Sequence, residues 1–147
     1  MYFEDFVAGK KAFTPERKIT AKNLDAFLDI CGLHLPMFMS DEGAQVMGHR
    51  QRLVPGPLIL SMAMGLVKEI GWFDHVVAVI AFEDLRFRKA LHPEQSVKAE
   101  IRVKDIKLTR NPERGLVVLT YKVFNQNSEM VLSAEGKYLI RTRHQGG

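Results

Sequence analysis

The chain contains almost no cysteine and no long uninterrupted apolar segment. Cys31 is the single cysteine among 147 residues, which excludes an internal disulfide. It fits a reducing cytoplasm, where a lone cysteine is most often a small buried side chain. The longest apolar stretch, residues 53–67, has about fifteen residues and begins with proline and glycine close together, so it is too short to span a bilayer. The N-terminal MYFEDFVAGKK lacks the apolar core of a signal peptide. We therefore expect a cytoplasmic protein with no membrane partner.

A strong excess of one charge is also missing. The 21 lysines and arginines stand against 17 acidic residues, for a net charge of +4, and the basic residues are scattered through the chain. This distribution argues against a nucleic-acid partner and indicates at most a mild attraction for anionic ligands such as phosphorylated cofactors. The five histidines show no spacing typical of metal ligands, so we predict no metal site.

The chain has no repeat, linker or low-complexity segment, so we expect one domain over residues 1–143 and a flexible tail over 144–147. The first half is predicted to be mainly helical. Thr20 and Ser40 are typical N-cap residues, the second followed by two acids that complement the helix dipole. After Thr20, apolar residues recur at the spacing of one helix face: Leu24, Phe27, Leu28 and Cys31.

The most informative predicted helix is GPLILSMAMGLVKEIGW, residues 56–72. Pro57 suits the first helical turn, where its missing N–H costs nothing. Between Leu58 and Val67 only Ser61 and Gly65 interrupt the apolar residues. A helix that is apolar on all sides must be wrapped by other elements rather than laid on a surface.

The second half of the chain supplies that wrapping as strands. Residues 75–82 form a continuous apolar run, and residues 116–124 and 129–143 show further strand patterns. In SVKAEIRVKDIKLT the alternation changes phase at Lys104 and Asp105, which predicts a β-bulge there. The expected fold is α+β, a curved antiparallel sheet wrapped around a central buried helix.

Four segments in a fixed order carry a family resemblance: YFEDFVAGK (2–10), LVPGPLILSMAMGL (53–66), FEDLRFRKALHPEQSV (82–97) and FNQNSEMVLSAEG (124–136). Together they resemble the MaoC-like hydratases and dehydratases, hotdog-fold relatives of (R)-specific enoyl-CoA hydratases. The resemblance implies a hotdog protomer that pairs into a homodimer or higher oligomer. It also implies an acyl-thioester substrate, with coenzyme A or acyl carrier protein as part of that substrate and no separate cofactor.

The same resemblance locates the family's proton-handling residues in a motif G-D-x-N-P-[IL]-H. Residues 32–38, GLHLPMF, match its glycine and proline. However, Leu33 occupies the Asp position and Phe38 the His position, and neither side chain can transfer a proton. The position before Gly56, often histidine in the family, is Pro55. The resemblance therefore implies that the usual catalytic dyad is absent from this chain.

Other residues remain candidates for the chemistry. His34 and His49 are candidate bases, although each also fits a solvated loop histidine. The amides of Gly56 and Leu58 at the start of the central helix are candidate donors to a thioester carbonyl, although PG also fits a simple turn. Arg88, with its basic neighbours, could bind the phosphates of coenzyme A or simply face water.

Three functions stay open at this point. The chain could be a non-catalytic subunit paired with a second hotdog chain that supplies Asp and His. It could be a hydratase or an acyl-CoA thioesterase with relocated catalytic groups. It could also bind an acyl thioester without turnover. Whether the chain is an enzyme is therefore not decided by its sequence.

Overall fold

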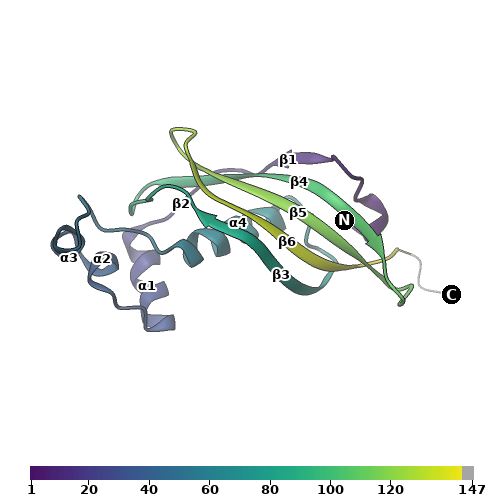
Figure 1. The fold of residues 1–147 in the computed structure, drawn as a ribbon, viewed down its shortest axis with the longest axis horizontal. Helices are drawn as coiled ribbons and strands as arrows, with labels where there is room; N and C mark the ends of the chain where they lie inside the picture. Colours follow the sequence, from purple (N-terminus) through teal and green to yellow (C-terminus); the bar gives the residue numbers. More distant parts are fainter. Residues whose placement is uncertain (144–147) are drawn as a thin grey trace.

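The computed structural model describes residues 1–143, so the predicted flexible tail at 144–147 lies outside the described residues. A short 3-10 helix, η1, precedes two short strands and three helices, and the long central helix α4 is followed by four long strands (Figure 1). The elements are η1 (Phe3–Asp5), β1 (Lys11–Phe13), β2 (Arg17–Lys18), α1 (Ala21–Cys31), α2 (Pro36–Met39), α3 (Asp41–Val46), α4 (Gly56–Glu69), β3 (Val76–Phe87), β4 (Ser96–Leu108), β5 (Arg114–Asn125) and β6 (Met130–Arg141).

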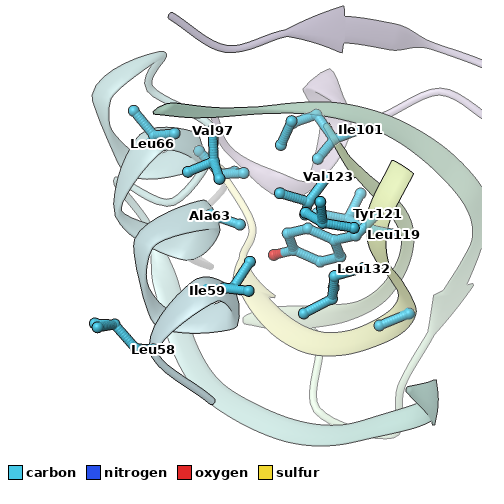
Figure 2. Packing of buried hydrophobic residues seen from close by; sticks show 14 of the residues in the cluster. Leu58, Ile59, Ala63, Leu66, Val97, Ile101, Leu119, Tyr121, Val123 and Leu132 are labelled. Carbon is cyan, nitrogen blue, oxygen red and sulfur yellow. The ribbon is translucent and has the colours of Figure 1, made fainter. Parts of the chain in front are cut away.

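The strands form one antiparallel sheet in the order β1-β4-β5-β6-β3, with β2 also paired to β4. The sheet curves along α4, and α1 to α3 lie together at one end of the molecule (Figure 1). Figure 2 shows Ile59 and Ala63 of α4 turned toward Val123 and Leu132 of the sheet. All four side chains are buried in one hydrophobic core. The predicted α+β sheet around a central helix is confirmed.

Both predicted N-caps are confirmed. Thr20 Oγ1 accepts a hydrogen bond from the Asn23 amide (3.0 Å), and Asn23 Oδ1 accepts one from the Thr20 amide (3.2 Å), so two free N–H groups of α1 are satisfied. Ser40 Oγ likewise accepts from the Gly43 amide (2.9 Å) at the start of α3. The expectation of a buried Cys31 is wrong. Residues 29–31 at the end of α1 are exposed, so the thiol lies at the surface.

The predicted bulge in β4 is confirmed by a register shift between Val103 and Asp105. Before the shift, the alternate apolar residues of β4 are buried, whereas Ile106 and Leu108 after it are exposed. The bulge therefore marks the point where the strand leaves the core.

The apolar run that begins at residue 75 forms β3, which is an edge strand because within residues 1–143 it pairs only with β6. Its outer residues are about half exposed, with relative accessibilities of 48% for Val77, 48% for Val79 and 52% for Ile80. An edge strand presents unpaired backbone groups beside these side chains. This apolar edge of β3 is consequently an open surface of the chain.

Candidate functional site

A pocket of about 370 Å³ opens at the N-terminal end of α4. Its wall combines α2, the segment that leads into α4, the end of β3 and the loop after it, and it is mostly apolar. The lining residues are Met37, Phe38, His49, Leu53, Val54, Gly56, Ile59, Phe87, Arg88, Lys89, Ala90, Leu91 and Val131. Ligand sites of this size usually combine such an apolar lining with a few placed polar groups. Four of the residues singled out from the sequence meet here: Phe38, His49, Gly56 and Arg88.

Phe38 forms part of the pocket wall from the one-turn helix α2. Pro36 begins this helix at a position where proline needs no hydrogen bond. Phe38 is 8% exposed and belongs to the hydrophobic core, while Leu33 is partly buried against that core and does not line the pocket. At the position that the family motif assigns to histidine, the pocket thus presents an apolar ring.

Arg52 holds this wall in place, and no sequence pattern had singled it out. Its Nε donates a hydrogen bond to the Phe38 carbonyl (2.6 Å), and its guanidinium pairs with Asp25 of α1. Its backbone amide donates to Asp41 Oδ1 of α3 (2.9 Å). One arginine, whose side chain is 13% exposed, therefore joins α1, α2, α3 and the segment before α4.

The first turn of α4 offers a backbone donor to the pocket. The Leu58 amide already donates to the Pro55 carbonyl (3.1 Å), and Pro57 has no N–H. Within residues 1–143 the Gly56 amide has no hydrogen-bond acceptor. Of the two predicted donors, Gly56 is therefore the one left free, at the positive end of the helix dipole.

The structure separates the two candidate histidines. His49 lines the pocket, and its ring has no hydrogen-bond partner in the described part of the chain. His34 does not line the pocket, and its Nε2 lies 3.1 Å from Asp29 Oδ1 on the exposed side of α1. A carboxylate orients His34, but it is His49 that shares the pocket with Gly56.

Arg88 also reaches the pocket. Its Nε donates to Ser133 Oγ (2.9 Å), which leaves the other guanidinium nitrogens for a ligand. Its neighbour Lys89 pairs with Glu129, and that contact, followed by one from Asn125, holds the pKa of the Glu129 carboxyl below its usual value. Of these two cations at the pocket, Arg88 is thus the one without an ion pair in the described part of the chain.

Two kinds of feature, metal-binding clusters and membrane-spanning helices, are absent from residues 1–143. Among residues 1–143 no three His, Cys, Asp or Glu side chains gather in a way that could hold a metal ion. None of the helices described is long and apolar enough to cross a bilayer.

Sequence comparison gives one informative relative. No protein-family model matches the chain. The protein MaoC of Klebsiella aerogenes is 28% identical over 103 residues, which cover 70% of this chain. The match covers 30% of that relative, so the chain corresponds to a minor part of its length.

Solved structures match over nearly the whole chain. A monoamine oxidase regulatory protein from Archaeoglobus fulgidus superposes with a TM-score of 0.89 at 25% identity, covering 98% of this chain and 96% of that one. A Mycobacterium tuberculosis protein with a double hotdog fold gives 0.85 at 21% identity, covering all of this chain but 46% of the other. The (R)-hydratase of A. caviae gives 0.75 at 19% identity, covering 92% of this chain and 97% of that one.

The chain is therefore a hotdog-fold protein, as the sequence predicted. Together with the MaoC relative, the structural neighbours confirm the resemblance to MaoC-like hydratases and dehydratases. One further neighbour, the HadBC (3R-hydroxyacyl-ACP dehydratase) complex of Mycobacterium tuberculosis, has a TM-score of 0.76 at 17% identity, covering 90% of this chain and 96% of that one.

Proposed function

We propose that this chain binds acyl thioesters of coenzyme A or acyl carrier protein in the pocket beside Gly56, as a non-catalytic hotdog subunit. The observation that carries the proposal is the juxtaposition of a free Gly56 amide with the buried ring of Phe38 in one apolar pocket. The amide can hold a carbonyl oxygen, and the apolar wall can take an acyl chain. The ring cannot act as an acid or a base.

The hydration or dehydration chemistry would then need a second hotdog chain that supplies Asp and His. The apolar edge of β3 supports such pairing, because an exposed edge strand can accept another chain. The residues that follow along the same segment, Phe87 to Ala90, line the pocket, so a partner on this edge would lie close to the ligand. The proposed partner is a related hotdog chain that carries Asp and His, because a second copy of this chain would again present Leu33 and Phe38 at those positions.

The oligomeric state can be tested at this edge. Ile80→Lys places a charge on the half-exposed edge and should convert an oligomer to a monomer in light-scattering measurements. Val7→Lys is the matched control, since Val7 is 61% exposed elsewhere on the chain. A wild-type protein that purifies from its source cells as a monomer or as a homo-oligomer, with no other hotdog chain bound, would contradict the subunit proposal.

A second candidate function is supported by His49, because this histidine lines the pocket that contains the Gly56 amide. As a general base it could activate water for hydration of an enoyl thioester or for hydrolysis of an acyl thioester. The purified chain should be incubated with crotonyl-CoA and with butyryl-CoA, and the products followed by mass spectrometry. Binding without product supports the non-catalytic subunit. Turnover that His49→Ala abolishes and His34→Ala preserves supports the enzyme.

A further inference from the structure

Phe87 lies against Gly56, the residue whose free amide opens α4 at the pocket. A Cβ atom added to Gly56 would come within 2.6 Å of Phe87 Cζ and still closer to two other ring atoms. Real Cβ atoms essentially never approach a neighbour so closely, so the ring occupies the space that any side chain at position 56 would need. The absence of a side chain on Gly56 is therefore what admits the ring of Phe87.

A bulge in β3 turns this ring toward α4. Phe82 pairs with Gly136 and Phe87 pairs with Leu132, and both partners lie on the buried face of β6. Residues five apart on a regular strand point to opposite faces. An extra residue between Glu83 and Arg86, where Asp84 has φ 50°, brings both phenylalanines to the same face.

One side of the Phe87 ring packs against Gly56, and much of the rest is exposed. Phe87 is 56% exposed, although it lines the pocket and touches Gly56. A carbonyl oxygen bound by the Gly56 amide would sit about 2.9 Å from its nitrogen, and the carbonyl carbon about 1.2 Å further on. The carbon next to that carbonyl would then lie beside the ring of Phe87.

We propose that Phe87 sets the width of the pocket beside Gly56 and restricts the site to acyl thioesters that are unbranched at the carbon next to the carbonyl. This inference rests on the proposed binding of acyl thioesters. A straight chain needs less room beside the ring than a chain with a methyl branch at that carbon, which would clash with it. Truncating Phe87 removes the obstacle without touching the Gly56 amide.

Two isomeric probes test this assignment by isothermal titration calorimetry: butyryl-CoA, which is straight, and isobutyryl-CoA, which carries the branch. Wild-type protein should bind butyryl-CoA at least about ten-fold more tightly, a difference equivalent to roughly 1.4 kcal/mol. Phe87→Ala should bring the two affinities within about two-fold of each other by improving isobutyryl-CoA binding. The matched control is Phe13→Ala, because Phe13 is a phenylalanine with 58% exposure on β1 that does not line the pocket.

A preference for butyryl-CoA that survives in Phe87→Ala, or equal affinities in the wild type, would overturn the role of Phe87 and leave thioester binding intact. Failure of the wild type to bind either isomer would overturn both. The contact itself is tested without ligand: Gly56→Ala should lower the melting temperature by several degrees in the wild type and by much less in Phe87→Ala. An equal loss in both backgrounds would show that the ring does not touch Gly56 and would overturn the inference.

Discussion

Replacing Arg52 should loosen the pocket and destabilise the fold. The charged Nε donates to a carbonyl in a largely buried position, and hydrogen bonds of this kind contribute about 1.5–3 kcal/mol. The ion pair to Asp25 adds about 0.2–1 kcal/mol, because the Asp25 side chain is 62% exposed. Arg52→Ala should therefore lower the free energy of unfolding by roughly 2–4 kcal/mol.

Urea unfolding of the variants measures this loss through the transition midpoint. Arg52→Lys should give an intermediate value, because lysine keeps the charge but lacks the fork that reaches Phe38 and Asp25 together. Arg50→Ala is the control, since Arg50 is exposed and uses its backbone carbonyl to accept from Gln45 Nε2 (3.2 Å). The affinity for butyryl-CoA should fall with Arg52→Ala alone. A loss below about 0.5 kcal/mol, as at ordinary surface sites, would refute the role assigned to Arg52.

Two further predictions concern hydrogen bonds away from the pocket. The hydroxyls of Tyr121 and Tyr138 form a hydrogen bond with each other in the core. Tyr121→Phe should lower the free energy of unfolding by about 1–3 kcal/mol, because it leaves the Tyr138 hydroxyl without its partner. The variant with Phe at both positions should lose less than the sum of the two single variants. Burial raises the pKa of both hydroxyls, so the unfolded chain loses these protons at a lower pH than the folded chain. In circular-dichroism melts, stability should therefore be constant near neutral pH and fall above about pH 10. A melting temperature that stays constant above about pH 10 would contradict the burial of the two hydroxyls. The Arg143 guanidinium, which hydrogen-bonds Asp5, lowers the pKa of that carboxyl below 3.8, so its contribution to stability is present above that pH and is lost as pH falls through the lowered pKa. In NMR titrations Arg143→Ala should raise the pKa of Asp5, and an unchanged pKa would exclude the contact in solution.

Features with a local physical cause were predictable from the sequence. Thr20 and Ser40 cap helices because their side chains reach amides three residues ahead. The phase change at Lys104 and Asp105 revealed the bulge in β4, because strand alternation has a strict period of two. The apolar helix α4 required a surrounding sheet.

The pocket depends on contacts between distant segments and could be predicted only in part. Gly56 and Arg88 were candidates because each stands at a recognisable place, the start of a helix and the end of a strand. The bulge at Asp84 left no clear signal, since charged and apolar residues still alternate after it. The link from Arg52 to Asp25 spans 27 residues, a separation at which no periodic pattern operates. The spacing of Cys31 placed it on the apolar face of α1, but it is the last residue of that helix and lies beyond the core, so its side chain is exposed.

The central claim, that the Gly56 amide holds the carbonyl of an acyl thioester, is tested most directly by NMR. Amide spectra of the ¹⁵N-labelled protein should be recorded with butyryl-CoA and with free coenzyme A at equal saturation. We predict that the Gly56 signal moves downfield with butyryl-CoA and stays in place with free coenzyme A, because free coenzyme A lacks the thioester carbonyl that the account assigns to the Gly56 N–H. A Gly56 signal that is unmoved by butyryl-CoA, while other amides of the pocket shift, would contradict the account.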